Sequence, residues 1–426
     1  MLSFLPDGKD KSATQFPVVT CALIFVNIAA YFWALSLGES AMGAMGLIPA
    51  QPTLSGIIAS MFMHGNLIHL AWNMLFLGLV GPRVEYALGR LEYAIFYFGS
   101  GFAAALLHIV VSQTLTSEAA NIPMIGASGA IAGILGIFAI RYYKTRIQVW
   151  YFVLIAMISV AESFGWGYIT LAICIILIPA LIFTCWRRFD ISALIVLGFW
   201  FFQQIAYGIR GLLEPQSGGV AYWSHIGGML FGMALAYALK MGLEGTKEYL
   251  ITDARTNLEQ GTTADAAENL RTVLEHDPGN ADIHSELAGT YVMQNDRDSA
   301  IAHYQRSIVL LLSKGDREKA VAHYAELKHH YKDARLDLKS EYQLSRYMVE
   351  AGYHAPALQL MQDIAQTHPG TPEAEVALMK AGDLHLNTFA DYQSALKCYN
   401  RFLAEYPHSS YRAMVEKSLD QARQKL

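Results

Sequence analysis

Long apolar runs fill the first 240 residues, and they limit the possible folds more than any other feature of the sequence. The first run, from Phe16 to Leu37, has the length of a membrane-spanning helix, which needs about 20 apolar residues. Backbone amides inside a bilayer must pair within their own segment, so such runs form helices. We therefore expect an all-α fold in which residues 16–240 form a polytopic membrane helical bundle.

Clusters of Lys and Arg lie between alternate apolar runs. The runs that we interpret as spans are 16–37, 64–81, 91–113, 126–140, 191–209 and 221–239. The positive-inside rule assigns the clusters between them to the cytoplasmic side. This makes residues 1–15 a cytoplasmic N-terminal tail and returns the chain to the cytoplasm at Lys240. The location that we expect is multi-pass in the inner membrane of a bacterial cell.

The segment 147–186 is nearly continuous in its apolar character, with an interruption at 162–167 and a close at Arg187 and Arg188. Positive residues before and after it both belong on the inner side, so it must cross the membrane an even number of times. Two interpretations fit this requirement: an inserted hairpin of two spans, or a re-entrant segment. The bundle has six spans, or eight if the hairpin crosses.

The composition changes near residue 247, where polar amphipathic helices replace the apolar runs. Residues 1–246 contain only 11 of the 31 Lys and Arg and 10 of the 36 Asp and Glu, so the remainder is acidic. We expect a soluble α-helical repeat domain over 247–426. No basic patch with interleaved aromatic residues occurs, which argues against nucleic acid as a partner. The four cysteines are scattered without metal-ligand spacing, so we expect neither a metal nor a cofactor.

A period of 34 residues marks this second half of the chain. Small residues twelve positions apart, with a large residue four positions later, recur along it. The recurring positions are Ala254, Ala266, Leu270 and Val273, then Ala288, Ala300, Tyr304 and Ser307, then Ser345, Ala357 and Met361, then Ala395, Tyr399 and Phe402. The pattern resembles tetratricopeptide repeats, whose small residues let paired helices pack closely. A plain array of helical hairpins is the alternative. Either architecture favours a protein partner on the repeat domain.

A serine and a histidine lie at matching depths in two of the expected spans. Ser128 precedes Arg141 by 13 residues and His225 precedes Lys240 by 15, and these two positive residues mark the inner boundary. At about 1.5 Å of rise per residue, both side chains lie roughly 20 Å above that boundary. An ionisable residue in a membrane helix indicates function, and serine with histidine is the minimum set for nucleophilic acyl transfer. No carboxylate lies in the middle of a span, so we expect a dyad.

Small residues allow the two spans to approach each other closely. They stand four positions apart at Gly129 and Gly133 and again at Gly228 and Gly232. Simple helix packing is the alternative reason for such spacing. His69 and Asn73 share one face of the second span at a similar depth, where they suggest hydrogen-bond donors for an oxyanion. Bonding to a neighbouring helix is the alternative role for this pair.

Together these motifs closely resemble the rhomboid family of intramembrane serine proteases. The matching pieces are Phe-Met-His at 62–64 with His69 and Asn73, Gly81 with Glu85 and Gly89, Gly-Ala-Ser-Gly at 126–129, and Ser-His-Ile-Gly-Gly at 224–228 with Gly232. The resemblance implies a six-span rhomboid core in which Ser128 is the nucleophile and His225 is the general base and then the acid. It also implies that His69, Asn73 and the backbone N–H of Ser128 bind the oxyanion, with Gly126 as support.

The resemblance further implies the substrate, which is a membrane protein cleaved within its transmembrane helix in the lipid bilayer. Bulky residues on the second and fifth spans are candidates for a lateral substrate gate, and core packing is the alternative for them. They are Trp72, Phe199, Trp200 and Phe202. A different class of function is a catalytically silent rhomboid-like membrane adaptor or quality-control factor, which would have no use for a nucleophile beside a base.

Two positions depart from the family pattern. Ser224 stands where the family usually has alanine, and Ala132 stands where some members place a tyrosine against the histidine ring. Neither change removes a residue of the expected dyad. They leave open which side chain supports the ring of His225.

Overall fold

The computed structural model describes residues 16–38, 43–115, 119–148, 190–213 and 220–426. Our expectations for the tail at 1–15 and for most of the segment 147–186 therefore fall outside the described residues. The chain divides into two compact units, Met1–Lys247 and Glu248–Leu426.

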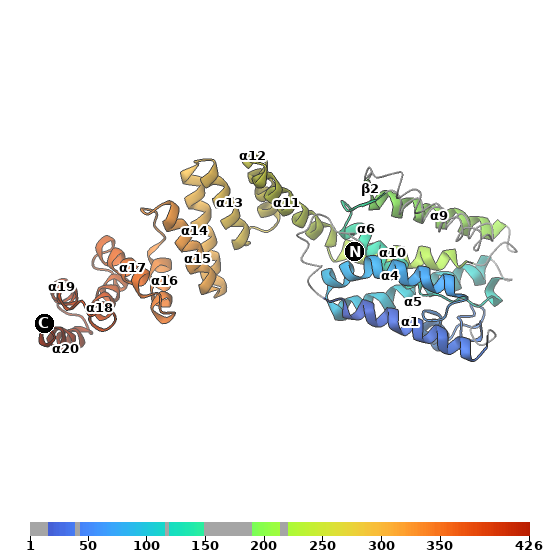
Figure 1. The fold of residues 1–426 in the computed structure, drawn as a ribbon, viewed down its shortest axis with the longest axis horizontal. Coiled ribbons are helices and arrows are strands. Elements are labelled where there is room, and N and C mark those ends of the chain that lie inside the picture. The colour runs from blue at the N-terminus through green and yellow to red at the C-terminus, as the bar shows by residue number, and fades with distance from the viewer. Residues whose placement is uncertain (1–15, 39–42, 116–118, 149–189, 214–219) are drawn as a thin grey trace, which may run out of the picture. The chain divides into compact units, whose positions relative to one another are not determined.

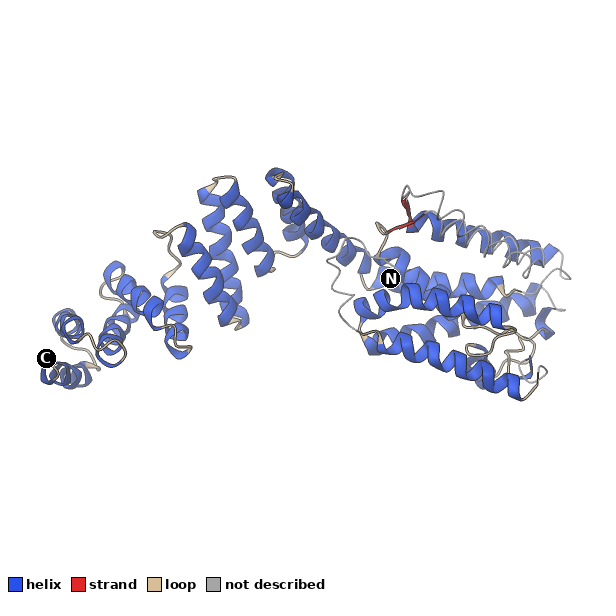
Figure 2. Ribbon diagram, in the orientation of Figure 1, coloured by secondary structure: helices blue, strands red, loops and turns tan. Residues whose placement is uncertain are grey.

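In the part of the first unit that the structure describes, six apolar helices form a bundle (Figures 1 and 2). They are α1 (Val18–Ser36), α4 (Leu67–Leu88), α5 (Arg90–Leu115), α6 (Ser128–Arg141), α9 (Ala193–Leu213) and α10 (Tyr222–Ala238). Four of these, α1, α4, α5 and α9, are long and apolar enough to cross a membrane, and α10 joins the next helix through a bend of 68°. The unit is an integral membrane bundle, and the fold is all-α apart from a short ribbon among the described residues.

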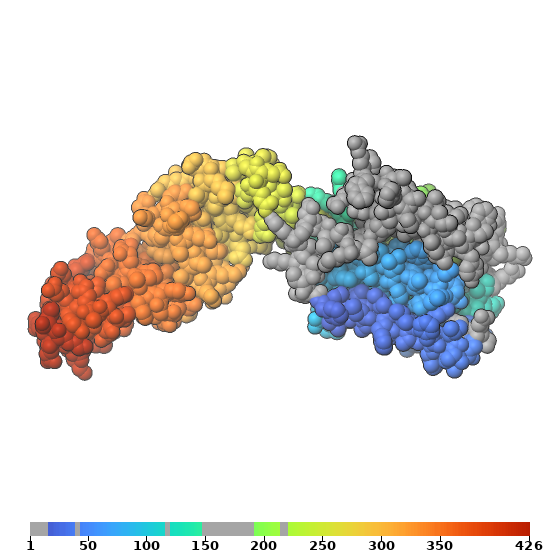
Figure 3. Space-filling view, in the orientation of Figure 1, coloured from blue at the N-terminus to red at the C-terminus, as the bar shows by residue number. Residues whose placement is uncertain are grey.

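Helix α6 forms the centre of the bundle. It is buried along almost its whole length and packs against α10, α5 and α4. Helix α1 instead lies on the outside, where Phe25 is 71% exposed and Trp33 is 54% exposed. In the space-filling view α1 forms one outer face of the unit (blue in Figure 3). A helix that turns large apolar side chains outward in this way is suited to contact with lipid.

The second span continues beyond the point at which we expected it to end. Helix α4 passes through Pro82 and stops at Leu88, and Gly89 follows with a φ of 89°. The carboxylate of Glu85 is buried and accepts hydrogen bonds from the backbone N–H groups of Val19 and Thr20 at 2.9 and 2.8 Å. These are unpaired donors at the start of α1. The extra turn of α4 therefore caps a neighbouring helix.

Short elements connect the long helices. They are α3 (Leu54–Ser60), the 3₁₀ turn η2 (Ala119–Asn121), and the strands β1 (Arg146–Gln148) and β2 (Asp190–Ser192). The two strands pair antiparallel, with Ile147 opposite Ile191. The described residues on either side of 149–189 therefore lie side by side.

Ten helices follow in the repeat half. They are α11 (Met241–Glu259), α12 (Thr263–His276), α13 (Ala281–Met293), α14 (Arg297–Lys314), α15 (Arg317–His330), α16 (Leu338–Glu350), α17 (His354–Thr367), α18 (Pro372–Asn387), α19 (Tyr392–Glu405) and α20 (Arg412–Gln424). The recurring small and large residues of the period are all buried. The single helix α15 lies between the hairpin of α13 and α14 and the hairpin of α16 and α17. This extra helix explains why Ala300 and Ala357 are not 34 residues apart. Helix α11 passes through the division between the units.

Candidate active site

Ser128 and His225 are in direct contact. The Oγ of Ser128 lies 2.7 Å from Nε2 of His225, across 97 residues of sequence. Ser128 is the first residue of α6, and His225 is in the first turn of α10. A hydroxyl and a ring nitrogen at this distance form a hydrogen bond in which the serine donates to a neutral imidazole.

Helix α6 is shorter than the hydrocarbon core of a bilayer. Its 14 residues measure about 21 Å at 1.5 Å per residue, which is less than the roughly 30 Å of the hydrocarbon core. The chain before it is not helical, and its backbone is paired, because Met124 bonds with Leu47 in both directions and Gly126 N donates to Ser60 O. Irregular backbone at membrane depth is tolerated where it is buried or lines a water-filled cavity. Ser128 therefore directly follows an irregular segment whose backbone is paired, as a segment within a bilayer requires.

The glycines of α6 and α10 bring the two backbones together. A Cβ on Gly228 would overlap the carbonyl oxygen of Gly129, and a Cβ on Gly232 would overlap that of Gly133. Gly133 also lacks room for a side chain, because a Cβ there would overlap the hydroxyl of Ser100. Close backbone contact of this kind needs small residues at the interface. It fixes the distance between the ends of the helices that carry Ser128 and His225.

A residue that our sequence analysis did not single out completes the contacts of His225. Gln204 of α9 is 5% exposed, and its Oε1 lies 2.8 Å from Nδ1 of His225. An amide oxygen can only accept, so the proton of the neutral ring is on Nδ1 and the lone pair of Nε2 faces Ser128. Trp200, one turn earlier on α9, packs against the same ring with centroids 5.8 Å apart. The signal was present as two adjacent amides, Gln203 and Gln204, within an apolar span.

His69 and Asn73 lie near the start of α4. Asn66 caps the start of this helix, and its Oδ1 accepts a hydrogen bond from the backbone N of His69 at 2.8 Å. The His69 ring borders Gly126, because a Cβ on that glycine would lie 2.9 Å from His69 Cε1 and 3.5 Å from Ser128 Oγ. Gly126 has a φ of 129°, a conformation that favours glycine. Asn73 is buried, and its Nδ2 has no hydrogen-bond partner among the described residues.

Known protein families match the chain in three places. The Rhomboid domain model matches residues 51–193, and tetratricopeptide repeat models match 257–308 and 376–409. The chain carries a rhomboid domain followed by tetratricopeptide repeats. The match to the rhomboid domain includes Ser128, His69 and Asn73 and ends before His225.

Curated relatives match part of the chain, and about a third of the aligned residues are identical. The chain is 33% identical over 160 residues to "Rhomboid protease AarA" of Providencia stuartii, covering 32% of this chain and 57% of that protein. It is 32% identical over 107 residues to "RHOMBOID-like protein 4" of Arabidopsis thaliana, covering 24% of this chain and 25% of that protein. It is 30% identical over 134 residues to "Rhomboid protein 1, mitochondrial" of Saccharomyces cerevisiae, covering 31% of this chain and 38% of that protein. The chain thus spans less than two thirds of each relative.

A solved structure is similar to the repeat half. The match to a tetratricopeptide repeat protein from Parabacteroides merdae covers 42% of this chain and 77% of that protein. The two are 16% identical, with a TM-score of 0.20.

The residues expected to form a gate separate into two groups in the rhomboid domain. Phe199 and Phe202 of α9 point outward and are 48% and 69% exposed. Trp200 is half-buried against the ring of His225. Trp72 of α4 is half-buried. Helix α9 packs mainly against α10, so its outward face is turned away from the bundle core.

Proposed function

We propose that the chain is an intramembrane serine endopeptidase that cleaves the transmembrane helices of other membrane proteins. The observation that carries the proposal is the 2.7 Å contact between Ser128 Oγ and His225 Nε2. A nucleophile beside a base, within a bundle of apolar helices, suits acyl transfer at membrane depth. The curated relatives named as rhomboid proteases support the same class of function.

The reaction begins with proton transfer from Ser128 to His225. As the serine Oγ attacks the carbonyl carbon of the scissile peptide, its proton moves to Nε2 of the imidazole. The tetrahedral intermediate collapses when the imidazolium returns that proton to the leaving amine nitrogen and the C–N bond breaks. A water molecule then attacks the acyl ester with the same histidine as base, which releases the new carboxylate and restores Ser128.

Three donors are proposed to stabilise the oxyanion. The backbone N–H of Ser128 is at the start of α6, where amide groups are unpaired and the helix dipole favours negative charge. Asn73 offers a buried Nδ2 without a partner among the described residues. The His69 ring borders the same place across Gly126. Preorganised donors in a site shielded from water are among the largest contributions to catalysis.

Gln204 and Trp200 are proposed as positioning residues for His225. Because the amide oxygen of Gln204 accepts the Nδ1 proton, the tautomer with a free lone pair on Nε2 is favoured. Trp200 covers one face of the ring, in the role that a tyrosine at position 132 would have in some rhomboid proteases. Both residues belong to α9, so the helix that bears the exposed Phe199 and Phe202 also supports the base.

Substrate is proposed to approach along α9. Phe199 and Phe202 present bulky side chains on its outer face, and Trp72 lies on α4. Smaller residues at Trp72 and Phe202 should raise the turnover of a membrane substrate, because they open the lateral path. Unchanged or lower turnover would contradict the gate.

The repeat half is proposed to be a cytoplasmic arm that binds a partner protein. It follows Lys240, on the side that the positive-inside rule assigns to the cytoplasm of a bacterial cell. Stacked helical hairpins of the tetratricopeptide type present extended surfaces for proteins. Tethering a client there would raise its concentration near the membrane without changing the chemistry.

Labelling with a fluorophosphonate probe tests the catalytic proposal. The purified protein should be labelled at Ser128, and Ser128→Ala and His225→Ala should each abolish both labelling and cleavage. Ser224→Ala is the matched control, because it removes a buried hydroxyl beside the base and should leave activity in place. Cleavage by the Ser128→Ala protein at the wild-type rate would refute the mechanism. A folded wild-type protein that binds membrane proteins but is neither labelled nor active would favour the silent adaptor.

A further inference from the structure

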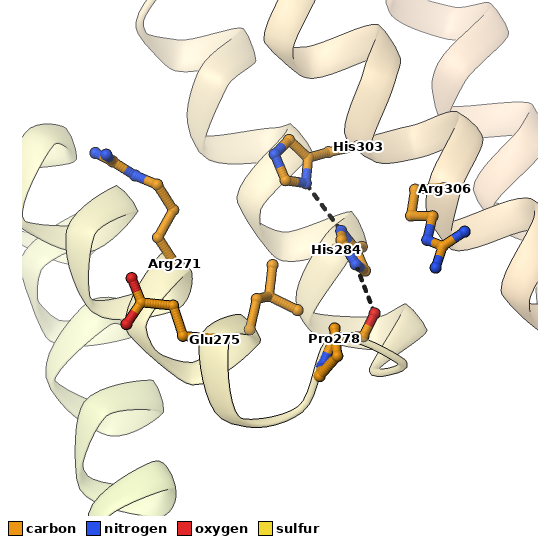
Figure 4. Close-up of a pocket in the computed structure, with 7 residues that line it drawn as sticks. Arg271, Glu275, Pro278, His284, His303 and Arg306 are labelled. Atoms are coloured by element: carbon orange, nitrogen blue, oxygen red, sulfur yellow. Dashed lines mark hydrogen bonds between the residues drawn. The ribbon is translucent and has the colours of Figure 1, made fainter.

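A hollow of about 470 Å³ lies in the repeat domain between α12, α13 and α14. Its polar lining consists of Arg271, Glu275, His284, His303 and Arg306, together with the backbone of Pro278. Figure 4 shows the two histidines in the middle, with Arg271 on one side of them and Arg306 on the other. Two of these side chains are arginines and one is a glutamate. The pocket is therefore locally positive in a domain whose overall charge is negative.

The two arginines differ from most others in the domain. The arginines with a carboxylate partner pair as Arg255–Glu286, Arg297–Asp333, Arg317–Glu350, Arg335–Asp363, Arg401–Glu405, Arg412–Glu416 and Arg423–Asp420. Within the described residues, neither Arg271 nor Arg306 has such a partner; Arg271 donates only to the carbonyl of Ala267. A guanidinium fork matches the geometry of a carboxylate. Two of them in the lining of one pocket are well suited to a ligand with acidic groups.

The histidine pair adds an acceptor to the pocket. Nε2 of His284 lies 3.2 Å from the carbonyl oxygen of Pro278, which can only accept, so this nitrogen carries the proton. Burial lowers the pKa of His284, so the ring is neutral at neutral pH and its Nδ1 must accept. The donor is Nδ1–H of His303, 2.9 Å away. Burial and the neighbouring His284 likewise lower the pKa of His303. Its Nε2 is therefore left with a lone pair and has no hydrogen-bond partner among the described residues.

We propose that this pocket binds an acidic segment of a partner protein, with one Asp or Glu carboxylate on each arginine. This inference rests on the proposed role of the repeat domain as a partner-binding arm. The arginines lie on opposite sides of the histidine pair, which suits an extended chain with two acidic residues. A backbone N–H of the peptide can donate to Nε2 of His303. Leu274 and Pro278 provide an apolar wall for the aliphatic part of the segment.

A phosphate group fits the same lining less well. It has no N–H to offer the lone pair on Nε2 of His303, whereas a peptide backbone has one. The volume of about 470 Å³ is also within the range of pockets that hold ligands much larger than a single phosphate.

Fluorescence anisotropy with the full chain in detergent tests the proposal. The probe is a labelled peptide of alternating Glu and Leu, and its control is the same peptide with Gln for every Glu. The acidic peptide should bind, and Arg271→Gln and Arg306→Gln should each weaken binding by about tenfold, as expected for the loss of one charged hydrogen-bonded contact. The affinity of Arg271→Lys for the peptide should lie between those of the wild type and Arg271→Gln, because lysine keeps the positive charge but lacks the two-pronged guanidinium. The double variant Arg346→Gln with Lys417→Gln removes two charges elsewhere in the domain and should bind as the wild type does.

Several results would overturn the pocket assignment. The double variant Arg271→Gln with Arg306→Gln is compared with the control double variant. If both bind the acidic peptide with equal affinity, the peptide binds elsewhere. Binding of the Gln peptide as tightly as the acidic one would exclude recognition of carboxylates. Displacement of the peptide by equimolar inorganic phosphate would assign the pocket to a phosphate group. If a native partner still binds the double pocket variant, the arm keeps its proposed role and only this site is wrong. If the wild type captures no partner at all, the proposed role itself fails.

Discussion

At the scale of single residues, His225 is held on three sides. Ser128 bonds one ring nitrogen, Gln204 bonds the other, and Trp200 lies against one face of the ring. A neutral amide thus occupies the place that a carboxylate has in a triad. It orients the ring and selects the tautomer, but it brings no negative charge to stabilise the imidazolium.

Replacing Gln204 by Leu should lower kcat by about tenfold to a hundredfold, which corresponds to the roughly 1–3 kcal/mol cost of an unsatisfied buried hydrogen-bonding group. The loss should appear in kcat and in the rate of fluorophosphonate labelling, with substrate binding unchanged. Gln203→Leu is the control, since it removes the neighbouring amide of the same helix turn, which makes no hydrogen bond to the ring. Equal effects of the two variants would show that Gln204 has no positioning role.

Gly126→Ala should destabilise the site by about 1–3 kcal/mol, because a residue with a Cβ is strained at a φ of 129°. The new methyl would also press on the His69 ring, and labelling of Ser128 should fall by about a hundredfold when groups are displaced by roughly 1 Å. Thermal unfolding and labelling rate measure the two effects. Gly198→Ala on α9 meets open space and should change neither. Normal labelling of the Gly126→Ala protein would remove this glycine from the proposed oxyanion support.

The sequence indicated that Ser128 and His225 share one level of the bundle, because each precedes a positive residue by a similar number of residues and helix rise is constant. It did not allow the rotation of α9 to be predicted. Both faces of that helix are apolar, so periodicity does not distinguish the face toward α10 from the face toward lipid. The buried stripe contains Trp200 and Gln204 four residues apart, and this spacing is visible in the sequence once the amide is taken as a marker of the inner face.

At the scale of the elements, α6 and α10 act as one rigid pair. Their backbones touch at Gly129 and Gly228 and again at Gly133 and Gly232. No side chain lies between them at these points, so the spacing of the helices does not depend on rotamers. The distance between nucleophile and base follows from this contact.

Gly228→Ala should destabilise the bundle by about 1–3 kcal/mol, the usual cost of overpacking, because its Cβ would overlap the carbonyl oxygen of Gly129. Separation of the helices should also slow labelling of Ser128. The melting temperature in detergent and the labelling rate are the measurements. Gly211→Ala on α9, where a Cβ meets open space, is the matched control. Wild-type stability of the Gly228→Ala protein would show that α6 and α10 can separate enough to accept a methyl group without cost.

The ends of elements were harder to predict than their existence. We expected the second span to stop near Gly81 because Pro82 and Arg83 follow, yet α4 continues to Leu88. Proline removes one hydrogen bond and disfavours the preceding turn. Here Glu85 is held by the start of α1, a contact between distant segments that local patterns do not contain.

At the scale of the whole molecule, two compact units share the helix α11. The membrane unit uses the first turns of that helix. The hydroxyl of Tyr143 lies 3.1 Å from Oγ1 of Thr246, and a Cβ on Gly245 would overlap the carbonyl of Arg141. The contacts of the rhomboid domain therefore extend past Lys240, and a functional boundary belongs at Lys247 rather than earlier.

A chain that ends at Lys247 should keep probe labelling of Ser128 and should cleave a generic helical substrate at the full-length rate. It should lose preference for its own clients, because the repeats are proposed to bind them. The test compares both chains on one substrate in detergent and in liposomes. Loss of labelling in a truncated protein that still melts cooperatively would make the repeats part of the catalytic unit.

His225, the proposed base, is on the last apolar helix of the membrane unit, 97 residues after the proposed nucleophile Ser128. Ribosomes add roughly 5–20 residues per second, so Ser128 is made seconds before His225 exists. During that interval the growing chain has a serine without its proton acceptor, and we expect it to be harmless to the translocation machinery around it. Under the proposed mechanism, a chain that stops before His225 would be inactive. The order of synthesis would then delay proteolysis until the last apolar helix of the membrane unit has been made.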